Sequence, residues 1–134
     1  MRRIDLWFLL LATTALMVGV GMGIWMGVIH DFQFAPVHAH LNLLGWASLA
    51  LFGLTYRAYP AMKESWLAGL HFVLAAVSAL LFPFGIALSI TGVTVAVAIV
   101  ASFLWLAGVA AFMAGLIRLA LASESRPMIF APAE

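Results

Sequence analysis

Four long apolar stretches dominate this 134-residue chain and leave little room for anything except helices that cross a membrane. They cover residues 6–29, 36–59, 66–90 and 93–121, and each is longer than the ~20 residues that a helix needs to span the hydrocarbon core. Only 8% of the residues are charged, against about a quarter in a typical soluble domain, and the mean hydropathy is +1.18. The sequence therefore predicts an all-α integral membrane protein, with one four-helix transmembrane domain over residues 1–121 and a tail over residues 122–134.

The charged residues predict an orientation. The first apolar stretch is too long for a cleavable signal peptide, whose apolar region has ~7–15 residues, so we expect it to remain as the first helix. The basic residues all fall on one side of a four-helix topology; they are Arg2, Arg3, Arg57, Lys63, Arg118 and Arg126. The positive-inside rule then places both termini, and the tail, in the cytoplasm. The start of the second helix consequently lies near the outer face.

The composition also excludes several classes of function. The chain has no cysteine, which rules out disulfides, thiolate metal sites, thiol catalysis and covalent c-type haem. It has no basic cluster of the kind that binds phosphate backbones, so we expect no nucleic-acid partner. The lipid bilayer is the one partner that composition predicts directly.

The second apolar stretch carries the residues that most suggest a function. It opens with Pro36, and His38 and His40 follow one residue apart. Ionisable side chains inside a membrane helix are functional candidates, because burying them without a partner is costly. Helical residues advance by ~100° each, so the two imidazoles lie roughly 200° apart and cannot easily bind one metal ion together. Asn42 shares the face of His38, and Gly45 continues that face and leaves room beside the imidazole.

Haem iron is one candidate for these histidines, because imidazole is a standard axial ligand and a neutral imidazole avoids burying a charge. Trp46 is a candidate for stacking beside a haem. A ridge of Gly19, Gly23 and Gly27 on the first helix lets a flat ligand, or another helix, approach closely. The alternative is that the histidines only hydrogen-bond between helices and that Trp46 and the glycines only pack. Spacing and placement alone leave both interpretations open.

Two other histidines have simpler interpretations. His30, beside Asp31, is a candidate additional ligand for copper or zinc together with His38 or His40, or else a solvated loop residue. His71, in the third helix, lies across the membrane from the pair and is expected to make only a hydrogen bond.

A family resemblance rests on four segments. VHAHLNLLGW (37–46) and LFGLTYRAYP (51–60) resemble the helix with the His-x-His pair in the large subunit of haem–copper oxidases and their nitric-oxide-reductase relatives. HFVL (71–74) and LFPFG (81–85) are similar to the helix that follows it there. That subunit consists of twelve helices in three arcs of four. The resemblance implies that this chain corresponds to one arc and that a homotrimer rebuilds the twelve-helix ring, in a bacterial-type inner membrane.

The resemblance also implies a cofactor. In that family the first histidine of the pair ligates the high-spin haem and the second the low-spin haem. Here it implies haem b held by His38 of one protomer and His40 of the next, for electron transfer with a redox protein or quinol. Asn42, Gly45, Trp46 and Gly23 would then lie around the haem.

The chain lacks residues that the catalytic site of that family requires. It has no adjacent histidine pair for copper and no carboxylate within a predicted span. No catalytic residue is therefore assigned, and copper binding is only an additional hypothesis. The alternatives are an oxidase or reductase that acts on oxygen or nitric oxide, and a cofactor-free assembly or structural subunit of the membrane.

Overall fold

The computed structural model describes residues 3–124, and this part of the chain contains helices and no strands. The helices are α1 (Ile4–Ile29), α2 (Ala35–His40), the π-helix η1 (Leu41–Ser48), α3 (Leu49–Ala58), the short 3₁₀-helix η2 (Pro60–Glu64), α4 (Trp66–Ile90) and α5 (Ala96–Glu124). Because α2, η1 and α3 follow one another without a break, they act as one helix over Ala35–Ala58.

The prediction of four membrane-spanning helices is confirmed in length and composition. The candidate spans are Ile4–Ile29, Ala35–Ala58, Trp66–Ile90 and Ala96–Ala122. These features indicate a multi-pass membrane protein. Pro36 lies in the first turn of α2, as expected for a residue whose missing N–H has no helical partner there.

The turn between α4 and α5 starts where it was predicted, at Thr91 and Gly92, but lasts three residues longer. Gly92 adopts a left-handed backbone with φ of 74°, a conformation that costs glycine little. The N–H of Val93 then donates back to the carbonyl of Leu88 at 2.9 Å. The fourth helix therefore begins at Ala96 rather than at residue 93 and continues to Glu124. Residues 125–134 of the predicted tail lie outside the described residues.

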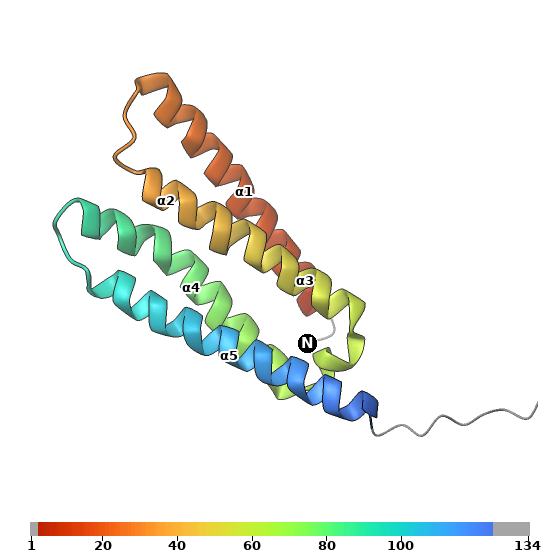
Figure 1. Ribbon diagram of the computed structural model, residues 1–134. Helices are drawn as coiled ribbons and strands as arrows, with labels where there is room; N and C mark the ends of the chain where they lie inside the picture. Colours follow the sequence, from red (N-terminus) through yellow and green to blue (C-terminus); the bar gives the residue numbers. More distant parts are fainter. Residues whose placement is uncertain (1–2, 125–134) are drawn as a thin grey trace, which may run out of the picture.

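The four long helices form two antiparallel hairpins (Figure 1). One hairpin pairs α1 with α2–η1–α3, and the other pairs α4 with α5. Both hairpin turns, residues 30–34 and 91–95, lie at the same end of the molecule, which we call the hairpin end. The opposite end, with residue 3, η2 and the end of α5, is called the terminal end. Within the second hairpin, the buried Ser78 hydroxyl donates to the Ala101 carbonyl at 2.6 Å.

The tightest packing between the two hairpins lies toward the terminal end. Its buried core consists of Ile4, Phe8, Ala12, Leu49, Tyr56, Met62, Ala68 and Ala75. Toward the hairpin end the space between α1, the second helix and α4 becomes an apolar groove. The His38 and His40 segment belongs to this less filled half of the molecule.

Candidate functional site

His38 lies in the glycine ridge of α1. Its Nδ1 is 2.9 Å from the carbonyl oxygen of Gly19, and a Cβ added to Gly23 would be only 3.0 Å from its Cε1. A carbonyl oxygen accepts hydrogen bonds and cannot donate them, so Nδ1 must carry the proton. The neutral ring then keeps its lone pair on Nε2. The predicted ridge thus accommodates an imidazole at Gly23, whereas Gly27 has no neighbour within 4 Å of an added Cβ.

The Asn42 side chain stabilises the backbone at His38. Its Nδ2 donates to the backbone carbonyl of His38 at 2.8 Å and lies 3.4 Å from the His38 Nδ1. The absence of a side chain at Gly19 makes this possible, because a Cβ there would be 2.7 Å from Asn42 Nδ2. The predicted shared face of His38 and Asn42 is therefore present in the structure.

His40 makes the same kind of hydrogen bond as His38, but on another side of the helix. Its Nδ1 donates to the carbonyl of Pro36 at 2.7 Å, which again leaves the lone pair on Nε2. Its ring stacks on Phe82 of α4, with ring centroids 5.3 Å apart and planes 20° apart. His38 thus faces α1 and His40 faces α4, in agreement with the predicted angular separation.

Neither imidazole uses its Nε2 within the chain. Among residues 3–124 the only hydrogen bonds of the two rings are made through Nδ1, and neither Nε2 is a fully buried polar atom. Both nitrogens thus have no hydrogen-bond partner among the described residues. His30 lies apart, with its Nδ1 3.3 Å from the Val28 carbonyl. No group of three His, Cys, Asp or Glu side chains that could hold a metal ion occurs in the described part of the chain.

Gly45, in the π-helix, packs against α1 at a distance from His38. Gly45 is buried, but a Cβ added there would lie 2.8 Å from the Cβ of Ala15 in α1, and no atom of His38 lies within 4 Å. Gly45 still shares the α1-facing side of the second helix with His38 and Asn42, since these three meet Ala15, Gly23 and Gly19 of α1. It does not leave room beside His38, because seven residues at the helical rise place it about 10 Å farther along the helix. Trp46 is 42% exposed on the outside of the hairpin.

Sequence reasoning missed a buried polar pair in the core near the terminal end. His71 is fully buried, and its Nδ1 is 3.1 Å from the hydroxyl of Tyr56. The expected hydrogen bond of His71 is therefore confirmed, but the ring is part of the core rather than of the membrane interface. Three phenylalanine rings surround it at centroid distances of 4.5 to 5.1 Å; they are Phe8, Phe52 and Phe112. Its Nε2 is buried and has no hydrogen-bond partner among the described residues.

The helix that contains the first predicted span begins at Ile4 and so includes Asp5, just before the predicted start at residue 6. Asp5 lies in the first turn of α1 and is only 2% exposed. Its Oδ2 is 3.2 Å from Nζ of Lys63 and 3.5 Å from the guanidinium of Arg57. The basic residues that predicted the orientation also neutralise this carboxylate. The i, i+3 spacing of Asp5 and the buried Phe8 was the signal that could have revealed it, because it places both on one helix face.

Comparison with protein-family models, curated proteins and solved structures finds no match to this chain.

Proposed function

We propose that this chain is a membrane b-type haem protein that transfers electrons, with His38 and His40 as axial ligands. The proposal rests on the hydrogen bonding of the two imidazoles, which is the same in both. Each donates its Nδ1 proton to a backbone carbonyl, at 2.9 Å for His38 and 2.7 Å for His40, and retains an unused Nε2.

This arrangement is the one that metal-binding histidines use. A ligating histidine usually donates its other ring N–H to a carbonyl or carboxylate, which fixes the tautomer, orients the ring and raises the basicity of the ligating nitrogen. Here the carbonyls of Gly19 and Pro36 accept the Nδ1 protons of His38 and His40. The Asn42 amide donates to the backbone carbonyl of His38. A haem with two imidazole ligands takes up and returns one electron.

The two rings lie on different sides of one helix, beside α1 and α4 of the same chain, so they cannot easily ligate one iron together within a single copy. The proposal therefore pairs His38 of one copy with His40 of the next. Repetition of such a head-to-tail contact closes into a ring if the rotation permits. A ring of three copies would have twelve helices, as in the large subunit of haem–copper oxidases that the sequence resembles.

The proposed orientation puts the hairpin end outside a bacterial-type inner membrane and both termini in the cytoplasm. The basic residues of the described chain support it, because Arg3, Arg57, Lys63 and Arg118 all lie at or near the terminal end. The histidine pair would then exchange electrons close to the outer face with a redox protein or a quinol.

The test is a reduced-minus-oxidised absorption spectrum of detergent-purified protein, compared with His38→Ala and His40→Ala. We expect sharp low-spin haem bands that are lost in both variants and unchanged by carbon monoxide. His30→Ala is the matched control, since it removes a histidine from the same end of the molecule, and it should retain the bands.

The same spectrum can contradict the proposal in two ways. A colourless protein after haem supplementation during expression would leave a cofactor-free structural subunit. Bands lost in only one variant, with carbon monoxide binding, would indicate one axial histidine and would favour the oxidase or reductase alternative. Replacing each histidine by glycine and adding free imidazole separates loss of a ligand from loss of the fold, because imidazole should restore the bands only in the former case.

A further inference from the structure

A cleft at the terminal end lies between the corner where η2 meets α4 and the last turns of α5 (Figure 1). The wall on α5 consists of Gly115, Arg118, Leu119 and Ala122, whose i, i+3, i+4 and i+7 spacing places them on one helix face. Met62 of η2 is buried against this face, since a Cβ added to Gly115 would lie 3.2 Å from its Cε. This contact holds η2 on α5, so the cleft is part of the fold.

Two charged side chains of opposite sign line the cleft, one on each wall. Glu64 is the last residue of η2, and Arg118 belongs to α5. Both are exposed, and neither forms an ion pair or a side-chain hydrogen bond within residues 3–124. Arg57 and Lys63 differ from them, because both lie within 3.5 Å of the Asp5 carboxylate. Glu64 and Arg118 are therefore available to a ligand that has one negative and one positive group.

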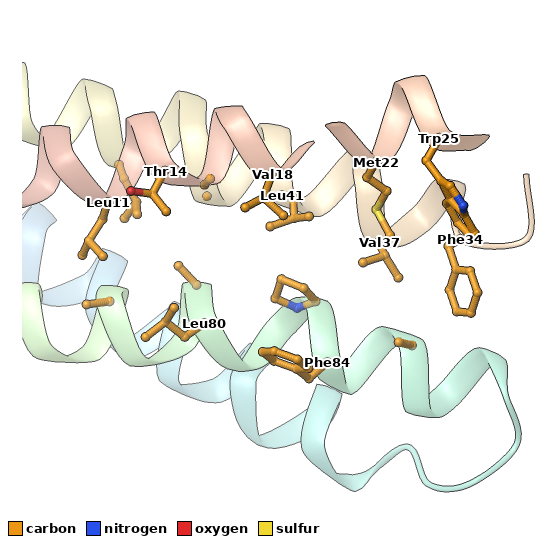
Figure 2. A pocket seen from close by; sticks show the side chains of 17 residues that line it. Leu11, Thr14, Val18, Met22, Trp25, Phe34, Val37, Leu41, Leu80 and Phe84 are labelled. Carbon is orange, nitrogen blue, oxygen red and sulfur yellow. The ribbon is translucent and has the colours of Figure 1, made fainter. Parts of the chain in front are cut away.

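The cleft also contains a hydroxyl, that of Ser65. Its Oγ accepts a hydrogen bond from the N–H of Leu67 at 3.3 Å, and its own proton has no acceptor among the described residues. The groove between the hairpins has a different lining, which consists of apolar and aromatic side chains and one threonine, Thr14 (Figure 2). The cleft, unlike that groove, can select its occupant by charge.

The position of the cleft along the helices places it at the level of the lipid headgroups. One candidate span begins at Trp66 and another ends at Ala122, and both of these residues line the cleft. Trp66 is 71% exposed, and tryptophan prefers the membrane–water boundary. An arginine near a helix end likewise extends its charged group toward the headgroups while its stem stays on apolar surface. In a bilayer, the molecules around this cleft are therefore phospholipid headgroups.

We propose that the cleft binds the headgroup of phosphatidylethanolamine, with the phosphate beside Arg118 and the ammonium beside Glu64. The guanidinium donates to the phosphate oxygens, and a primary ammonium has three N–H donors for a carboxylate. Phosphatidylcholine has the same charges but no N–H, and phosphatidylglycerol has no cation for Glu64. The two walls thus favour a zwitterionic headgroup whose nitrogen carries protons. His38 and His40 do not line the cleft, so this binding is independent of haem ligation.

The experiment is native mass spectrometry of the full-length protein, released from detergent with an equimolar mixture of dioleoyl phosphatidylethanolamine, phosphatidylcholine and phosphatidylglycerol. We expect several-fold more adducts with phosphatidylethanolamine than with either of the other two lipids. Glu64→Gln should lower these adducts by about two- to fivefold, the effect of one partly exposed ion pair, and leave those of phosphatidylcholine unchanged. Arg118→Gln should lower the adducts of all three lipids, because each has a phosphate. Asp31→Asn is the matched control, since it neutralises a carboxylate at the hairpin end, and it should keep the wild-type preference.

Three results would overturn the proposal. Equal retention of phosphatidylethanolamine and phosphatidylcholine by the wild type would mean that the ammonium protons are not recognised. More adducts with phosphatidylglycerol than with phosphatidylethanolamine would mean that Arg118 binds anionic lipid without help from Glu64. A preference for phosphatidylethanolamine that persists in Glu64→Gln would locate the binding elsewhere on the surface. The comparison of lipids on the wild type needs no variant, so the test remains decisive if a variant fails to fold.

Discussion

Replacing Gly85 in α4 by alanine should separate the two helices of the second hairpin. A Cβ at this position would lie 2.6 Å from the backbone nitrogen of Ala98, 2.8 Å from its Cα and 2.9 Å from the carbonyl carbon of Val97. Non-bonded carbons pack at about 3.5–4.0 Å, so α5 must shift by roughly 1 Å. The atoms in contact belong to the backbone, and no side-chain rotation can relieve the overlap.

The expected change in the free energy of unfolding of Gly85→Ala is the sum of two opposing effects. Overpacking of a well-packed interior costs about 1–3 kcal/mol, and a clash with backbone belongs at the upper end of that range. Alanine gains up to about 1 kcal/mol over glycine in helix propensity. We therefore expect Gly85→Ala to lower the free energy of unfolding by about 2 kcal/mol.

The assay is reversible unfolding in mixed micelles with increasing dodecyl sulfate, followed by circular dichroism. Gly69→Ala is the matched control in the same helix, because a Cβ there has no neighbour within 4 Å, and it should leave stability unchanged or raise it by up to about 1 kcal/mol. Equal stability of the two variants would refute the close approach of α4 and α5 at Gly85.

Three further predictions concern the polar contacts. Asp5→Asn removes the carboxylate that lies 3.2 and 3.5 Å from two basic side chains and should cost about 2 kcal/mol in the same unfolding assay; wild-type stability would show that the ion pairs contribute nothing net. Tyr56→Phe leaves both ring nitrogens of the buried His71 without a partner and should cost about 1–3 kcal/mol, whereas a neutral result would place the hydroxyl elsewhere. Gly23→Val puts a branched side chain where a Cβ is already 3.0 Å from the His38 ring; under the proposed haem ligation it should shift or weaken the low-spin bands, and an unchanged spectrum would contradict the contact between His38 and the glycine ridge.

Hydropathy was sufficient to predict the four long helices, because the membrane leaves so few structures for twenty or more apolar residues in a row. The glycine spacing on α1 likewise predicted a close approach, which the structure shows at Gly19 and Gly23. The alternation of His38 and His40 predicted different faces, since both precede the π-helix and lie in regular helix.

The errors have identifiable causes. Gly45 was expected to leave room beside His38, but seven residues at the helical rise place it about 10 Å away along the helix, where Ala15 of α1 fills the space. Asp5 was overlooked because a charge near a chain end suggests solvent, whereas its burial depends on Lys63 and Arg57 more than fifty residues away. The contact between Tyr56 and His71 likewise depends on how two helices meet, which the pattern along one helix does not specify.

Ligation of one haem by histidines of two different copies is the central claim, and co-expression of His38→Ala with His40→Ala tests it most directly. Neither variant alone has a complete pair, but a mixed ring restores one wherever an intact His38 meets an intact His40 of the next copy. Random mixing should therefore return low-spin absorbance to about a quarter of the wild-type value per chain. A mixture as colourless as the separate variants would contradict ligation between copies.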